Sequence, residues 1–145
     1  DIKILPEMVS ISSIGYDLVL ASVYAQGGGF EKTSLFRKLI SFFANMLFRL
    51  FFNVKTLTLS SFYRVYSVDL LKNIKQSYGT IITEKGFICM LEILLKSIKK
   101  EARIIEVPML LKSDNRKGHS KMKVFKTTFS YINFLFFKHN IYRGN

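Results

Sequence analysis

Apolar residues follow helical spacing in three parts of the chain. In segment 1–13 they recur every three or four positions, which predicts a short amphipathic helix. Segment 87–99 has the same spacing and ends at Lys99 and Lys100, where the helix dipole favours cations. Segment 122–137 predicts a final amphipathic helix. In the first segment the apolar positions are Ile4, Leu5, Met8, Val9, Ile11 and Ile14.

Shorter apolar runs predict strands between these helices. The run 17–22 follows Gly15 and predicts a buried strand. Apolar and polar residues alternate in segment 60–67, which predicts a strand or an extended loop. Segment 68–76 predicts a short helix. Segment 103–111 is β-rich, with Pro108 suited to an edge or a strand end. Loops are expected at 26–29, which is rich in glycine, and at 112–121, which is polar and basic. This order is an incomplete α/β layout.

Segment 34–52 carries a polar stripe on a strongly apolar helix. Arg37, Ser41, Asn45 and Arg49 recur every four residues, and almost all other positions are apolar. The apolar arc is too wide for an ordinary surface helix. Two interpretations remain open. The segment forms one or two helices lying in a membrane interface, with basic side chains reaching the headgroups, or it is a helix buried against protein.

Composition narrows the partners of the chain. Apolar residues make up 49% of it, enough for a packed core, and 22 Lys and Arg against 10 Asp and Glu give a net charge of +12. Such a balance favours an anionic partner. The 14 Phe and the lack of a recognised nucleic-acid motif favour a membrane surface over nucleic acid. Cys89 is the single cysteine, which excludes an internal disulfide and a cysteine-based zinc site. No apolar run reaches the ~18 residues that a spanning helix needs.

Four segments, in order, resemble motifs of the polyprenyl-phosphate glycosyltransferases of glycosyltransferase family 2, in particular the dolichol-phosphate mannosyltransferases. The resemblance covers nearly the whole chain, and it depends on the ordered set more than on any one motif. The segments are Asp17–Tyr24 with Gly27 and Gly28; Ser34–Ser41 with Ala44 and Asn45; Thr58–Tyr66; and Glu106–Pro108 with Arg116–Met122.

The resemblance implies that residues 1–145 are the C-terminal part of one nucleotide-diphospho-sugar transferase domain of the GT-A type, with interfacial helices at 34–52. Asp1 matches a third Asp that follows the family's Asp-x-Asp pair, so we expect that pair upstream of this chain and a helix-capping role for Asp1. A divalent metal, Mg²⁺ or Mn²⁺, would be bound mainly by residues outside the chain, and this piece alone would be inactive.

The implied reaction moves a hexose, with mannose favoured, from a nucleotide sugar such as GDP-mannose to a polyprenyl or dolichyl phosphate. It would take place at the cytoplasmic face of a membrane, without a transmembrane segment in this chain. The acceptor phosphate is already an anion, so the reaction needs cations more than a strong base. Arginine suits this task because its planar fork grips phosphate oxygens in pairs.

The candidate catalytic residues are therefore Arg64, Arg37 and Glu92. Arg64 lies in an aromatic stretch, and its alternative role is an ion pair with an acid such as Glu92. Glu92 is the one charge in an apolar helical run, where it would pair with an arginine or bind sugar hydroxyls. The resemblance adds candidate substrate-binding residues: Tyr24 from the first motif, and Arg116, Gly118, Ser120 and Lys121 from the basic loop.

Three positions depart from the family pattern. Val23 stands where the family usually has arginine, Thr58 where it has aspartate, and Phe62 where it has glycine. These changes leave open a family 2 transferase with another sugar or acceptor, such as a glucosyl or aminosugar donor. A non-catalytic, basic membrane-binding protein is the alternative from a different class.

Overall fold

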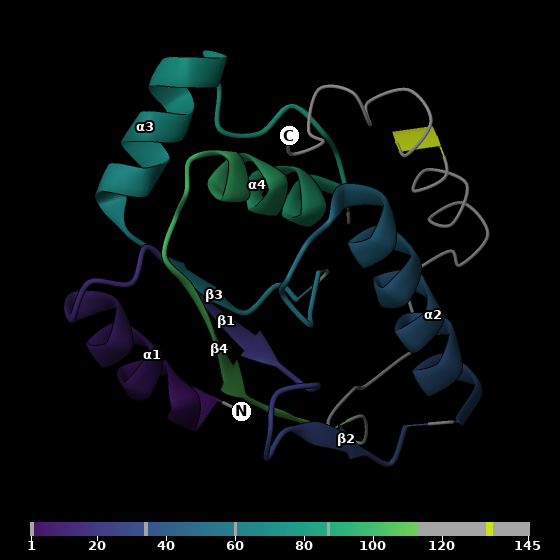
Figure 1. Ribbon diagram of the computed structural model, residues 1–145. Helices are drawn as coiled ribbons and strands as arrows, with labels where there is room; N and C mark the ends of the chain where they lie inside the picture. The colour runs from purple at the N-terminus through teal and green to yellow at the C-terminus, as the bar shows by residue number, and fades with distance from the viewer. Residues whose placement is uncertain (1, 34, 60, 87, 113–132, 135–145) are drawn as a thin grey trace.

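The computed structural model describes residues 2–33, 35–59, 61–86, 88–112 and 133–134 (Figure 1). It is a mixed α/β structure. In chain order its elements are the 3₁₀ turn η1 (Ile2–Ile4), α1 (Leu5–Ser13), β1 (Leu18–Ser22), β2 (Gly29–Glu31), α2 (Leu35–Phe52), β3 (Arg64–Tyr66), α3 (Val68–Tyr78), α4 (Ile88–Lys99), β4 (Ile104–Pro108) and β5 (Leu110–Lys112).

Strand β1 is the centre of a three-stranded sheet with the order β3-β1-β4. It pairs antiparallel with β3 and parallel with β4, in a register that places Leu18 beside Ile104 and Ser22 beside Pro108. The carboxyl ends of the two parallel strands therefore meet at Ser22 and Pro108. Strands β2 and β5 form a separate parallel pair just beyond this edge. The amide of Met109 links the two sheets, donating to the carbonyl of Ser22 at 2.9 Å.

Alternate residues of β1 face two different cores, as the period of a strand requires. Leu18 and Leu20 pack in a core with residues of α2, α3 and α4. Val19 and Ala21 pack with Met8 of α1 on the other side of the sheet. Figure 1 shows α1 on one side of the sheet and α3 and α4 on the other. All five residues of β1 are buried, which explains why its sequence is a continuous apolar run.

Most of the elements predicted from sequence are confirmed. Helices α1, α3 and α4 and strands β1, β3 and β4 occupy the predicted segments, and Pro108 ends the edge strand β4. Ser67 caps α3 by accepting from the amide of Leu70 at 3.2 Å, and Gly79 ends that helix at φ 73°. Asp1 lies outside the described residues, and Ile4 occupies the cap position of α1. Strands β2 and β5 were not predicted.

Helix α2 is one continuous helix, and it is inverted relative to an ordinary surface helix. Its polar stripe faces the protein: Asn45 is 8% exposed, and Ser41 is half-buried. Most of its apolar residues face outward, so that Leu50 is 73% exposed and Phe43 is 56% exposed, whereas Phe48 and Phe52 pack in the core. The amide of Asn45 is bonded inside the protein, and the expectation that the basic side chains of this segment reach headgroups stays a prediction. No helix among the described residues has the length and apolarity needed to cross a membrane.

Candidate functional site

The carboxyl end of β1 carries a buried hydroxyl network. Ser22 is fully buried, and its Oγ lies 2.6 Å from Oγ1 of Thr58. The same Oγ accepts hydrogen bonds from the amides of Tyr24 and Ala25, each at 3.2 Å. Gly28 closes the turn by donating to the carbonyl of Ala25 at 2.8 Å. This turn follows the strand end where ligands of open α/β sheets usually bind.

The edge segment, defined here as residues 57–59 and 61, runs alongside this network and is held from three directions. Glu106 of β4 accepts from the amides of Leu57 and Thr58 at 2.7 and 2.8 Å. Asn45 of α2 accepts from the amide of Leu59 at 3.1 Å and donates to the carbonyl of Ser41 at 2.9 Å. Arg64 of β3 binds carbonyls of the segment. The edge segment is therefore tied to both the sheet and α2.

Arg64 uses its guanidinium to organise the backbone around it. Nε donates to the carbonyl of Ser61 and Nη2 to that of Leu59, both at 2.6 Å. Nη1 donates to the carbonyl of Met90 at 2.7 Å and to the hydroxyl of Tyr66 at 3.2 Å. These bonds use four of the five N–H hydrogens of an arginine, which leaves one on Nη2 for another acceptor. Burial raises the pKa of Tyr66, although the charge of Arg64 opposes that shift.

Among the described residues Glu92 has a lysine as its partner, where the sequence predicted an arginine or sugar hydroxyls. Glu92 forms a buried ion pair with Lys96, one helical turn further along α4, at 2.8 Å. It also accepts from the hydroxyl of Thr83 at 2.6 Å and from the amides of Thr83 and Glu84. Burial raises the pKa of Glu92, but the bonds from Lys96, Thr83 and Glu84 outweigh it and lower that pKa below its ordinary value.

Lys96 extends this cluster to the segment between α3 and α4. Its Nζ donates to the carbonyls of Thr80 and Ile81 at 3.2 and 3.0 Å and lies 5.1 Å from the ring centre of Tyr78. The pair thus joins α4 to residues 80–84. The described hydrogen bonds of Arg64 go to backbone carbonyls and to Tyr66, which argues against its alternative role as a partner of Glu92.

Tyr24 joins the turn after β1 to α2. Its hydroxyl donates to Oγ of Ser41 at 2.8 Å, and its ring meets that of Phe30 edge-on at 5.7 Å. Arg37 lies on the same helix, one turn before Ser41, although only its backbone is described. The structure therefore brings Tyr24 to the helix that carries Arg37. Arg116, Gly118, Ser120 and Lys121 lie outside the described residues.

The described residues contain no group of three or more His, Cys, Asp and Glu that could hold a metal ion. A divalent metal at this edge would need ligands from outside the described residues.

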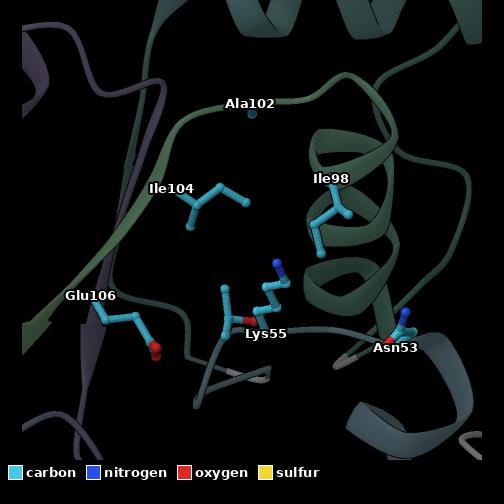
Figure 2. Close-up of a pocket in the computed structure, with 7 residues that line it drawn as sticks. Asn53, Lys55, Ile98, Ala102, Ile104 and Glu106 are labelled. Atoms are coloured by element: carbon cyan, nitrogen blue, oxygen red, sulfur yellow. The ribbon is translucent and has the colours of Figure 1, made fainter. Parts of the chain in front are cut away.

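A cavity of about 380 Å³ lies on the α4 side of β4 (Figure 2). Ile98 and Ala102 near the end of α4 and Ile104 at the start of β4 form its apolar wall, and Glu106 lies at one end. Oγ1 of Thr56 is buried there without a hydrogen-bond partner. The polar lining of the cavity includes the amine of Lys55 and the carboxylate of Glu106, and this mixture does not define one class of ligand.

The chain is similar to a dolichol-phosphate mannosyltransferase of Pyrococcus furiosus. The two are 29% identical over 138 residues, which cover 92% of this chain. The chain spans only 36% of the length of that relative. No family model matches the chain. The similarity supports a glycosyltransferase and agrees with a piece of a longer protein of that kind.

Sequence reasoning gave no role to two of the residues that shape this edge. In the sequence, Glu106 belongs to a family-like motif, and Asn45 belongs to the polar stripe and to another such motif. A carboxylate inside the apolar run Ile104–Pro108 is the available signal, because a charge withdrawn from water in a strand needs hydrogen-bond donors. For Asn45 the signal was an amide on a helix with very few polar positions.

Proposed function

We propose that this chain is part of a membrane-associated glycosyltransferase that moves a hexose, with mannose favoured, from a nucleotide sugar to a polyprenyl phosphate. The observation that carries the proposal is the similarity to a dolichol-phosphate mannosyltransferase along 92% of the chain. GDP-mannose is the favoured donor and dolichyl phosphate the favoured class of acceptor.

The convergence of family-like segments supports the proposal. Ser22 and Tyr24 from the first segment, Ser41 and Asn45 from the second, and Thr58 from the third meet through direct hydrogen bonds or a shared partner. Segments that are far apart in sequence thus form one edge beside the carboxyl end of a parallel strand, where a ligand of an α/β sheet is expected.

The outward face of α2 supports a membrane surface as the place of the reaction. Large apolar side chains of α2 are exposed along its outward face, whereas its polar residues Ser41 and Asn45 face the protein. The exposed ones are Leu35, Leu39, Ile40, Phe42, Phe43, Met46, Leu47, Leu50 and Phe51. An apolar face of this size needs an apolar partner. The net charge of +12 favours an anionic lipid surface over an uncharged protein surface.

The proposed reaction requires few catalytic groups from the described residues. A lipid phosphate attacks the anomeric carbon of the donor sugar, and the nucleoside diphosphate leaves. The guanidinium of Arg64 keeps its positive charge and one N–H at the edge, which suits an electrostatic role toward a phosphate. Glu92 is assigned to the fold, because Lys96 and the 83–84 backbone surround its carboxylate. Tyr24 is assigned to holding α2 against the edge. The family resemblance alone suggests that Arg37 and the loop 116–121 bind phosphates.

Two alternatives stay open. Val23, Thr58 and Phe62 depart from the family pattern, so a glucosyl or aminosugar donor is the second candidate. A non-catalytic membrane-binding protein would need the outward face of α2 but has no need for the edge segment.

A transfer assay with the full-length protein tests the proposal. Labelled GDP-mannose, UDP-glucose and UDP-N-acetylglucosamine are each offered with Mg²⁺ or Mn²⁺ and vesicles containing dolichyl phosphate. We expect label in the lipid phase with one donor only, GDP-mannose. Vesicles with dolichol, which lacks the phosphate, are the matched control and should take up none. Membrane binding without transfer from any donor would instead support the non-catalytic alternative.

A further inference from the structure

We propose that Glu106 is a positioning residue for the transfer reaction, because its carboxylate fixes the edge segment (residues 57–59 and 61) and, through it, Arg64. This inference rests on the proposed function. Glu106 stands in β4 beside Leu20 of β1, and its side chain lies on the same face of the sheet as that of Ile104. This is the face along which the edge segment runs.

The contact is a bidentate grip on two successive backbone amides. Oε2 accepts from the amide of Leu57 at 2.7 Å, and Oε1 accepts from the amide of Thr58 at 2.8 Å. Bonds of this length to an ionised acceptor are about twice as strong as those between neutral groups. Two donors that point at one carboxylate also fix the orientation of the peptide plane between them. A glutamine at this position has a single acceptor oxygen and would set an NH₂ group against one of the two amides.

The 57–58 peptide that Glu106 holds is connected to the carboxyl edge of the sheet through two contacts. The first is the side chain of Thr58, whose Oγ1 lies 2.6 Å from Oγ of Ser22 at the end of β1. The second is Leu59, the next residue, whose carbonyl accepts from Nη2 of Arg64 at 2.6 Å. A rotation of the 57–58 peptide would therefore move both the hydroxyl pair and the guanidinium.

The role requires a carboxylate at this place and does not follow from packing alone. Glu106 is only half-buried, and its neighbours Ile105 and Val107 belong to the opposite core. Removing its charge leaves both hydrophobic cores intact, so the principal loss is the grip on the edge segment.

The test compares Glu106→Gln with Glu106→Asp in the full-length protein. Glu7→Gln is the matched control, because it makes the same charge change at an exposed position of α1. Two readouts are needed: hydrogen exchange of the amides of Leu57 and Thr58, and steady-state transfer per folded molecule with separate kcat and KM. We expect Glu106→Gln to speed exchange at both amides by about tenfold or more. It should lower kcat by about tenfold while the donor KM changes by less than about twofold.

Glu106→Asp keeps both oxygens on a shorter stem and should lie between the wild type and Glu106→Gln in both readouts. Glu7→Gln should match the wild type. Unchanged exchange at residues 57 and 58 would overturn the inference, and so would faster exchange with an unchanged kcat. If the wild type transfers no sugar at all, the proposed function fails and the catalytic part of this inference with it. The exchange readout needs no activity, so it separates that failure from an error about what Glu106 holds.

Discussion

The buried pair of Glu92 and Lys96 gives the sharpest stability prediction. Both side chains are almost fully buried, their charged atoms lie 2.8 Å apart, and both bind the backbone between α3 and α4. Replacing one partner leaves the other charge buried without its counterion, which costs about 3–5 kcal/mol. We therefore expect Glu92→Gln and Lys96→Met each to lower the free energy of unfolding by that amount.

The double variant measures the interaction energy between Glu92 and Lys96 apart from their contacts with other groups. With both charges gone, neither is left uncompensated, so the double variant should be more stable than the sum of the two losses predicts. The expected interaction energy is about 1–3 kcal/mol. Urea denaturation of the full-length protein at neutral pH, followed by the fluorescence of its tyrosines or by circular dichroism, measures all four corners of the cycle. Additive losses, or single losses below about 1 kcal/mol, would refute the reasoning.

The same pair predicts how stability depends on pH. The pKa of Glu92 is lowered in the folded state, so its ionised form stabilises the fold at every pH above its unfolded pKa of about 4.3. That contribution is lost as pH falls below this value and through the lowered pKa. Glu92→Gln removes the titrating group, so the variant should lose less stability than the wild type on acidification below about pH 4.5.

Three further predictions concern other parts of the structure. Arg64→Lys keeps the charge but cannot reproduce four hydrogen bonds to the backbone and Tyr66. We therefore expect calorimetry to show a melting temperature lower by about 5–10 °C. An unchanged melting temperature with a large loss of turnover would show that Arg64 acts on the substrate and does not hold the fold. Phe43→Glu with Leu47→Glu should abolish co-sedimentation with anionic vesicles and leave the melting temperature within a few degrees, whereas binding that survives would mean that α2 faces protein. Gly28→Ala should destabilise the turn after β1 by more than about 1 kcal/mol, because its Cβ would lie 2.5 Å from the carbonyl oxygen of Ser22; a neutral outcome in urea denaturation would contradict the turn geometry.

Local pattern was sufficient for the elements that bury a continuous surface. β1 begins with four apolar residues because both of its faces are covered, and α4 is mostly apolar because residues 91–97 are all buried. The same kind of reading failed for β2 and β5. Each is only three residues long and is paired with the other across about eighty residues of sequence, so neither carries a period that could be read.

The α/β class, most element positions and the family resemblance follow from the amino-acid sequence, and the mannosyltransferase similarity supports the resemblance in part. The partner of each polar group follows from the folded arrangement. Glu92 pairs with Lys96 instead of an arginine, Asn45 faces inward, and Glu106 grips an amide 49 residues away. The physical reason is that spacing along a chain records which face of an element is buried. It does not record which distant segment supplies the donor or acceptor that a buried polar group requires.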